Sequence, residues 1–271
     1  MTPQPNQPTI NQPSANQVQA MSGSVQIRFY EELNDFLSPE QRKVTFHHPF
    51  KQPESIKDMI EALGVPHTEI DLILVNGHSV DFNYLVKDGD RISVYPVFES
   101  LDITPVTRLR PAPLRITRFV LDTHLGRLAA YLRLFGFDTL YRNDYDDQTL
   151  ANISAHEHRI LLTRDKQLLM RKQITHGHYV RATQPQKQLL EVLTRFDLHK
   201  TQQPFTRCMH CNGEIKPVRK EDIEPHLLPR TKAWYDAFWQ CEQCNKIYWK
   251  GSHYQRMQQL IKAINENGGL A

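Results

Sequence analysis

Four cysteines, the only ones in the chain, are the residues whose spacing points most directly to chemistry. They form two Cys-x-x-Cys pairs, Cys208 with Cys211 and Cys241 with Cys244. A two-residue spacer lets both thiolates of a pair face one ion, and two such pairs complete the tetrahedral coordination of a structural zinc ion. Because the protein fills all four positions of such a site, the ion would support folding and would not bind substrate. We therefore predict a structural zinc site in this part of the chain.

Five aspartates form a second group of candidates. Asp122 and Asp165 each follow a short apolar run that is typical of a buried strand, and Asp144, Asp146 and Asp147 lie just before a predicted helix. In an open parallel sheet, ligands bind beyond the carboxyl ends of the strands, where loops and helix starts converge. Carboxylate oxygens are the ligands that magnesium and manganese prefer, and such ions can activate water for phosphodiester hydrolysis. The aspartates therefore predict a hydrolytic metal site at this edge.

Helix capping is the alternative role for these side chains. Aspartate is common at helix N-termini, so Asp147 is equally interpreted as an N-cap, and Asp144 and Asp146 as loop residues. Asp122 and Asp165 are expected to have no capping role, because the helices that follow them begin with candidates of their own. We therefore expect these last two aspartates to be metal ligands.

Alternating strand and helix patterns must position the aspartates. Short apolar runs predict strands at 118–121, 139–141, 159–163 and 178–181. Helical spacing of apolar residues between and after them predicts helices at 125–135, 148–158, 166–172 and 185–196. Strands separated by helices of this length predict a parallel sheet that is covered on both faces.

A different pattern precedes this α/β region. Val25, Ile27 and Phe29 alternate as a strand with one buried face, and Val44 and Phe46 repeat that period across a hairpin. A helix with Pro53 near its first turn follows, and then strands at 71–75 and 91–95. Two strands, a helix and two or more further strands predict a β-grasp fold.

The run from Leu74 to Pro96 resembles the ubiquitin-like sulfur-carrier proteins. Those carriers end in a free Gly-Gly tail, whereas this chain continues through Phe98 and Ser100 into another domain. We therefore expect the β-grasp to act as a docking or substrate-presenting module and not as a sulfur carrier.

Composition divides the chain into five predicted segments. The first 23 residues are rich in Gln, Asn, Pro and Ser and carry no charge, which predicts a disordered tail and excludes a secretory signal. No apolar run approaches the roughly 18 residues of a membrane span, so we expect a cytoplasmic protein with reduced thiols. The segments are the tail at 1–23, the β-grasp at 24–100, a basic proline-rich linker at 101–115, the α/β domain at 116–200, and a zinc ribbon with a C-terminal helix at 201–271.

Charge and aromatic content favour an RNA partner for the second half of the chain. Residues 24–100 contain 7 basic and 13 acidic side chains, whereas residues 101–271 contain 26 and 17. Aromatic and basic residues of the cysteine region suit stacking on unpaired bases beside phosphate contacts, although small zinc domains also use aromatics as core. These residues are Trp234, Tyr235, Phe238, Trp239, Lys246, Tyr248, Trp249, Lys250 and Arg256.

The stretches around the aspartates resemble the Mut-seven C-terminal RNase family, a branch of the PIN-like nucleases. They are Arg118–Asp122, Leu125–Ala129, Leu132–Thr139, Asn143–Asp147 and Arg159–Asp165. The resemblance covers roughly residues 115–260, cysteines included, and the β-grasp looks like the ubiquitin-like domain of bacterial members. It implies a PIN-like fold and ribonuclease activity.

The resemblance also implies roles for single residues. The family's first acid falls on Asp122, its second on Asp147 with Asp146 as a rival, and its third on Asp165. Arg127 and Arg164 flank these acids and are candidates to bind a phosphate, or to serve as ordinary surface arginines.

We therefore expect an α+β multidomain protein that acts as a metal-dependent ribonuclease, with zinc in the ribbon, magnesium or manganese on the acids, and single-stranded RNA as substrate. The alternative is a non-catalytic RNA-binding or adaptor protein, which the lack of a clear fourth acid favours. The β-grasp is a candidate contact for a protein partner.

Overall fold

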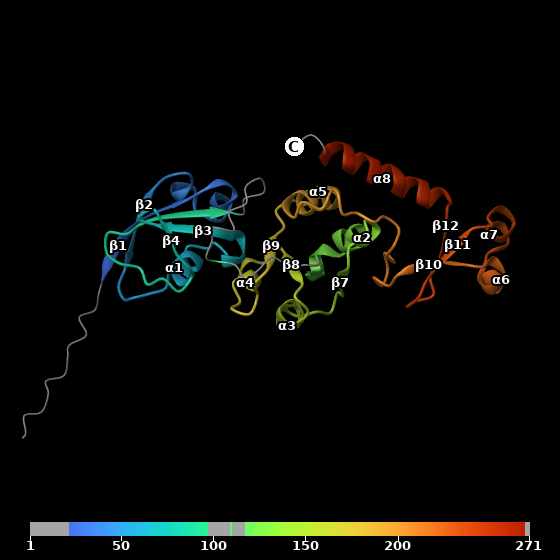
Figure 1. The fold of residues 1–271 in the computed structure, drawn as a ribbon, viewed down its shortest axis with the longest axis horizontal. Coiled ribbons are helices and arrows are strands. Elements are labelled where there is room, and N and C mark those ends of the chain that lie inside the picture. The colour runs from blue at the N-terminus through green and yellow to red at the C-terminus, as the bar shows by residue number, and fades with distance from the viewer. Residues whose placement is uncertain (1–21, 97–108, 110–116, 269–271) are drawn as a thin grey trace, which may run out of the picture.

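The computed structural model describes residues 22–96, 109 and 117–268, which form three folded parts in a row from the N-terminus to the cysteine region (Figure 1). The predicted tail, except for residues 22 and 23, and the prolines and arginines of the predicted linker lie outside the described residues. None of the described helices combines the length and the apolar character that a membrane span requires.

The N-terminal part is the predicted β-grasp. Its five strands are ordered β2-β1-β5-β3-β4, and β1 and β5 run parallel at the centre. The strands are β1 Gly23–Phe29, β2 Phe46–Phe50, β3 Ile70–Val75, β4 His78–Ser79 and β5 Arg91–Pro96. Val25, Ile27 and Phe29 are buried, as their alternation predicts.

One helix and three short 3-10 helices complete the β-grasp. They are η1 Glu31–Phe36, η2 Pro39–Gln41, α1 Ile56–Ala62 and η3 His67–Glu69. Ser55 caps α1 by accepting the Asp58 N–H, and Pro53 lies two residues before this N-cap. Val44 is exposed and lies before β2, which starts only at Phe46.

The central part contains the predicted parallel sheet. Its strands are β6 Phe119–Leu121, β7 Thr139–Tyr141, β8 Ile160–Thr163 and β9 Gly177–Tyr179, and all three pairings in the order β7-β6-β8-β9 are parallel. The helical segments are η4 Thr123–Leu125, α2 Gly126–Leu134, α3 Asp147–Glu157, α4 Lys166–Leu169 and α5 Pro185–Arg195.

Side-chain alternation along the strands separates two apolar layers. Phe119 and Leu121 of β6 belong to a core with α2 and α5, whereas Val120 belongs to a core with α3 and α4. Figure 1 shows these helix pairs on opposite sides of the sheet. Continuous apolar strands are typical of a sheet that is buried on both faces, which explains why β6 and the first three residues of β8 are entirely apolar.

The C-terminal part has an antiparallel sheet in the order β10-β11-β12. Its elements are β10 Ile215–Val218, α6 Lys220–Ile223, η5 Glu224–His226, α7 Pro229–Trp234, β11 Phe238–Cys241, β12 Ile247–Trp249 and α8 Ser252–Gly268. Helix α8 returns towards the central part, where Met257, Leu260 and Ile264 join the core of α2 and α5 (Figure 1).

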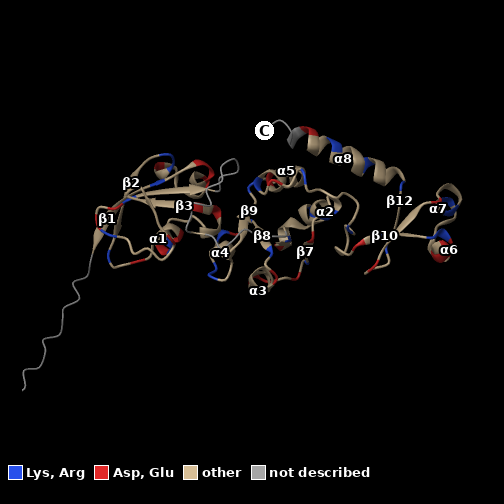
Figure 2. Cartoon of the chain, in the orientation of Figure 1, with Lys and Arg blue, Asp and Glu red and all other residues tan. Residues whose placement is uncertain are grey.

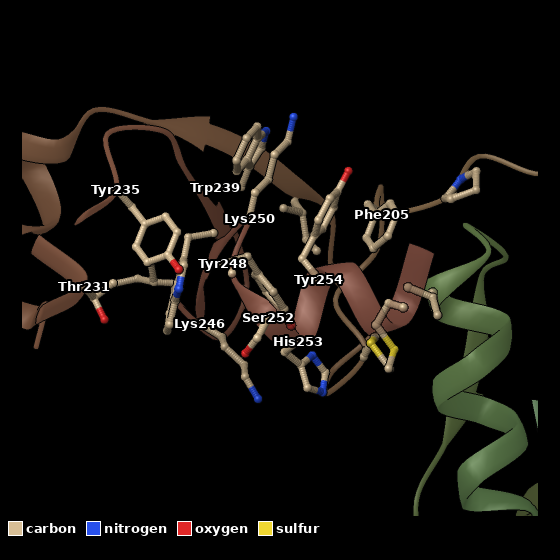
Figure 3. A pocket seen from close by; sticks show the side chains of 18 of the residues that line it. Phe205, Thr231, Tyr235, Trp239, Lys246, Tyr248, Lys250, Ser252, His253 and Tyr254 are labelled. Carbon is tan, nitrogen blue, oxygen red and sulfur yellow. The ribbon is translucent and has the colours of Figure 1, made fainter. Parts of the chain in front are cut away.

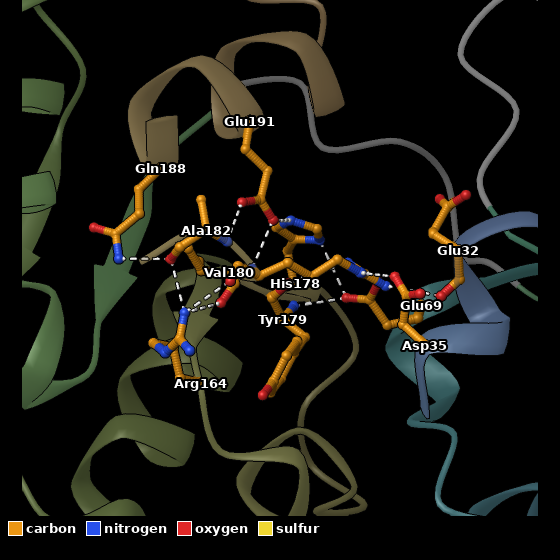
Figure 4. A network of polar contacts seen from close by, with 11 residues as sticks. Glu32, Asp35, Glu69, Arg164, His178, Tyr179, Val180, Ala182, Gln188 and Glu191 are labelled. Atoms are coloured by element: carbon orange, nitrogen blue, oxygen red, sulfur yellow. Dashed lines mark hydrogen bonds and ion pairs between the residues drawn. The ribbon is translucent and has the colours of Figure 1, made fainter. Parts of the chain in front are cut away.

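A buried polar network joins the β-grasp to strand β9 of the central sheet (Figure 4). His178 lies between two carboxylates, with Nδ1 3.1 Å from Glu69 of the β-grasp and Nε2 3.0 Å from Glu191 of α5. The Tyr179 N–H also donates to Glu69 at 2.7 Å. Because ionised carboxylates only accept hydrogen bonds, both ring nitrogens of His178 must donate, and the ring is therefore positively charged.

Charge pairing explains the pKa values in this network. Burial alone would raise the pKa of Glu69, but the His178 ring and two arginines outweigh it and lower the pKa to about 2. Burial alone would lower the pKa of His178, but Glu69 and the hydrogen bond to Glu191 outweigh it and raise the pKa. The network thus keeps Glu69 ionised and His178 protonated at the contact between the β-grasp and the central part.

Arg181 extends the contact at its rim. Its guanidinium lies 3.2 Å from Glu69, 3.3 Å from Asp35 and 5.0 Å from the centre of the Phe36 ring. The Phe36 ring also packs edge-on against Tyr179, with ring centres 5.3 Å apart. Polar and aromatic contacts therefore fix the β-grasp against β9.

We predict that Glu69→Gln lowers the free energy of unfolding by about 2 kcal/mol or more, because the substitution leaves His178 and Arg181 without their buried counter-charge. Glu31→Gln, the same change at an exposed position of the β-grasp, is the matched control and is expected to have little effect. Urea unfolding of both variants measures the difference. Equal stability of the two variants would contradict the role assigned to Glu69.

We predict that the ion pair of Glu69 and His178 contributes most to the free energy of unfolding between pH about 4.5 and about 6.5. The pKa of His178 is raised on folding, so its contribution is lost as the pH rises through that raised pKa; the pKa of Glu69 is lowered, so its contribution is lost as the pH falls from about 4.5 towards 2. Melting temperatures across the pH range should decline on both sides for the wild type. Glu69→Gln should flatten the acid side, and parallel profiles would count against this assignment.

Candidate functional site

Three of the predicted aspartates line one pocket of about 610 Å³. Asp122 follows β6, Asp165 lies two residues after β8, and Asp147 opens α3, so the pocket lies at the carboxyl edge of the parallel sheet. The other lining residues are Thr123, His124, Tyr145, Arg164, Lys166, Gln167 and Tyr179. The structure thus brings together aspartates that are up to 43 positions apart in the sequence, at the edge where they were expected.

Both strand-end aspartates cap helical turns, so the expectation that they would have no capping role was wrong. Asp122 accepts the Thr123 N–H at 2.5 Å at the start of η4, and Asp165 accepts the Gln167 N–H at 2.8 Å at the start of α4. The connections after β6 and β8 are too short for another residue to supply the cap. Each carboxylate retains acceptor sites that these hydrogen bonds do not occupy, because a carboxylate has about four of them.

Thr163 links the two strand-end aspartates, and the sequence analysis did not single it out. Its hydroxyl donates to Asp122 Oδ2 at 2.7 Å and accepts the Asp165 N–H at 2.9 Å. Thr163 is fully buried at the end of β8. A buried hydroxyl in an otherwise apolar strand is the signal that could have identified it.

The acidic run before α3 divides into separate roles. Asp146 is the N-cap of α3 and accepts the Thr149 N–H at 2.7 Å, and this hydrogen bond lowers its pKa. Asp144 forms a two-bond ion pair with Arg142, which lowers its pKa, and neither residue lines the pocket. Asp147 lines the pocket and is therefore the member of this run that is placed for chemistry there.

The two candidate phosphate-binding arginines are placed differently. Arg164 lines the pocket, but its Nη1 donates to the carbonyl oxygens of residues 180–182, the loop that follows β9 (Figure 4). Arg127 is exposed on α2 and is not among the lining residues. Lys166, which the sequence analysis did not select, lines the pocket beside Asp165.

The β-grasp supports one side of the pocket. Lys166 Nζ lies 4.9 Å from the centre of the Phe36 ring, and Tyr179 packs against that same ring. Two lining residues of the central part are thus held by an aromatic side chain of the N-terminal part, which a search for charged residues could not detect.

The acidic pocket offers carboxylate oxygens, the ligands that hard divalent cations prefer. Among the described residues, the four cysteines form a group of potential metal ligands with sulfurs within 4.8 Å of one another, whereas the three aspartates form no such group. Asp147 also lies 3.5 Å from Arg171. Magnesium retains several waters and often binds through one or two carboxylates, so Asp122 and Asp165 are the residues that could hold such an ion together with water.

The four cysteines form the arrangement that the spacing predicts. Cys208 Sγ lies 3.6 Å from Cys244 Sγ, and Cys211 Sγ lies 3.4 Å from Cys241 Sγ. Sulfurs at the corners of a zinc tetrahedron are about 3.8 Å apart, given a bond of about 2.3 Å, whereas a disulfide would join them at about 2 Å. The cluster is therefore of a kind that could hold a zinc ion, and its sulfurs are unpaired thiols.

Local hydrogen bonds favour thiolate at one of these sulfurs. Burial alone would raise the pKa of Cys208, but the Tyr248 hydroxyl at 2.9 Å and neighbouring backbone N–H groups outweigh it and lower the pKa to about 7. Burial raises the pKa of Cys211 to about 12. A cation among the four sulfurs would favour the thiolate form at all of them.

The first cysteine loop is tied to the central part. Arg133 of α2 is buried and donates to the carbonyl oxygens of His210 at 2.8 Å and Thr139 at 2.9 Å. Asn212 accepts the Thr139 N–H and donates to Asp138, each at 2.8–2.9 Å. The cysteine region is thus anchored to the parallel sheet by polar contacts as well as by α8.

These features define a class of protein: a ubiquitin-like domain, a parallel α/β domain with an acidic pocket, and a four-cysteine region. Two family models match the chain, the Mut7-C RNAse domain over residues 117–261 and the Mut7-C ubiquitin domain over residues 22–102. The chain belongs to the Mut7-C RNAse domain family, as the resemblance of its motifs predicts. No curated protein matches it.

We predict that the protein purified without chelator contains one zinc ion per chain and that Cys244→Ser abolishes stoichiometric binding, because a structural site needs all four ligands. Elemental analysis measures the metal content. His253→Ala changes an exposed neighbour outside the cluster and should retain the zinc. A metal-free wild type with four titratable thiols would contradict the assignment.

Proposed function

We propose that this protein is a metal-dependent ribonuclease that hydrolyses RNA phosphodiester bonds at the acidic pocket, in a PIN-like domain. Membership of the Mut7-C RNAse domain family supports the reaction class. The single observation that supports the location is that Asp122, Asp147 and Asp165 come from three separate segments and line the same pocket.

Asp122, Asp147 and Asp165 would hold magnesium or manganese, which would supply water activation and charge stabilisation at the phosphate. Thr163 orients Asp122 through its hydrogen bond, and Lys166 places a positive charge beside the acids for the RNA backbone. Arg164 holds the loop after β9 and so shapes the pocket wall. A single strand bends more easily than a duplex into such a site, so we propose single-stranded RNA as substrate.

The other parts of the chain have supporting roles in this proposal. The cysteine region, as a zinc ribbon, assists RNA binding with its aromatic and basic residues. The ubiquitin-like domain is the candidate surface for a protein partner, and its Phe36 also supports the pocket wall.

A second function, an RNA-binding or adaptor protein without catalysis, is favoured by two specific observations. Among the described residues, the lining of the pocket contains three acids, and these acids do not form a group of potential metal ligands as the four cysteines do. Glu157, at the far end of α3, does not supply a fourth acid, because it is outside the pocket lining and pairs with Arg159 at 2.7 Å. Measuring RNA binding and RNA cleavage on the same samples separates the two functions.

We predict that Asp165→Asn lowers the rate of manganese-dependent RNA cleavage by at least about 100-fold, because loss of a ligand removes several kcal/mol of charge stabilisation. Asparagine is as good an N-cap as aspartate, so the start of α4 should remain intact. Cleavage of a labelled single-stranded RNA, with the melting temperature measured in parallel, provides the readout.

Asp144→Asn is the matched control, since it makes the same change in an exposed aspartate outside the pocket lining. It should cleave at the rate of the wild type. If the wild type and Asp165→Asn bind RNA equally and neither cleaves it, the adaptor function is correct and the ribonuclease proposal is wrong.

A further inference from the structure

A second and larger pocket, of about 1150 Å³, lies between the three-stranded sheet of the cysteine region and the start of α8 (Figure 3). All three tryptophans of the chain, Trp234, Trp239 and Trp249, line it. Trp234 is 80% exposed and Trp249 36%, although burying such a side chain is strongly favourable. Large exposed aromatics gathered at one concave surface indicate a binding site.

The charge of this pocket has one sign. Its lining contains Arg207, Arg230, Lys246 and Lys250 and no aspartate or glutamate. Within the described residues, Arg230, Lys246 and Lys250 make no ion pair, whereas exposed lysines nearby, such as Lys216, pair with glutamate. Figure 2 shows the basic segments on α7 and beside β12 that border this surface. The ligand that complements the pocket is therefore negatively charged and also offers flat faces for stacking.

Lys250 indicates where a flat group would bind. Its ammonium lies 5.3 Å from the centre of the Trp239 ring and 5.8 Å from that of the Tyr254 ring, so it covers faces of both (Figure 3). A base stacked on Trp239 would occupy this position, and the flexible lysine would turn to the phosphate next to it. Phe205 lies 4.5 Å from Tyr254, centre to centre, and extends the aromatic surface.

The cysteine cluster is part of the construction of this pocket. The Tyr248 ring lines the pocket, while its hydroxyl lies 2.9 Å from Cys208 Sγ. The first cysteine loop also contributes Met209 to the lining. Binding in the pocket and filling of the cysteine site should therefore be coupled.

We propose that this pocket binds unpaired bases of single-stranded RNA, with Trp239 as the stacking platform and Lys250 and Lys246 as phosphate contacts. The inference deepens the proposed ribonuclease function and rests on it for the choice of RNA. It assigns the RNA contact to a defined pocket, separate in its residues from the acidic one, where stacking tolerates any base.

The test uses the full zinc-loaded chain carrying Asp165→Asn, without magnesium or manganese, so that RNA is not cut. Oligouridylate of roughly eight nucleotides falls within the usual site size for single strands. Because every tryptophan lines the pocket, intrinsic tryptophan fluorescence reports on this site alone. We expect quenching that saturates together with the fluorescence anisotropy of a labelled oligouridylate.

Substitutions of Trp239 and Lys250 in the same background, each with a control, locate the contacts. Trp239→Ala should raise Kd about tenfold, whereas Trp239→Phe should retain most of the affinity because a ring remains. Lys250→Ala should weaken binding and reduce the slope of log Kd against log salt by about one. Lys216→Ala, an exposed lysine of β10 outside the pocket, should change neither value.

Each outcome has a distinct meaning. RNA binding without quenching, or an unchanged Kd in a zinc-loaded Trp239→Ala, would overturn the inference, as would quenching by polyglutamate but not by oligouridylate. A protein that cleaves RNA but shows no quenching contradicts this inference alone. If RNA binds with quenching as described but the wild-type protein never cleaves RNA, the proposed ribonuclease function is wrong and the inference about this pocket holds.

Discussion

The hydrogen bond between Thr163 and Asp122 connects the ends of two neighbouring parallel strands, and the acidic pocket depends on that alignment. Strands β6 and β8 are in register from Phe119 with Ile160 to Leu121 with Leu162, so the residues that follow them emerge side by side. The same hydroxyl accepts the Asp165 N–H. One buried hydroxyl thus orients the Asp122 carboxylate and holds the backbone of Asp165. The apolar layers on both faces keep the strands in place.

Periodicity was sufficient to predict most of the fold. The β7 limits agree with the prediction, α5 differs by one residue, and the parallel sheet and β-grasp are present. In these elements the local periodic pattern and the tertiary packing agree. Errors fell at element ends, such as the end of α4, which stops at Leu169 and not at residue 172, because the cap decides the boundary there.

The two candidate sites differ in how much of their geometry could be predicted from the sequence. Spacing sufficed for the cysteines because two residues between ligands constrain the geometry directly. The acids were predicted at the correct edge of the sheet. Their capping hydrogen bonds depend on loop length, and so do the different roles of Asp146, which caps α3, and Asp147, which lines the pocket. Contacts between distant segments, such as Glu69 with His178 and Phe36 with Lys166, leave no pattern in a single sequence.

The C-terminal helix packs the cysteine region, with its aromatic pocket, against the central part of the chain. It begins beside the aromatic pocket at Ser252, and Ile264 is buried in the core of α2 and α5, the helices of the central sheet. Together with the Arg133 anchor, it keeps the cysteine region from turning independently. These contacts hold the two pockets at one separation. That separation would set a minimum length of RNA, because an RNA too short to span it could occupy one pocket but not both.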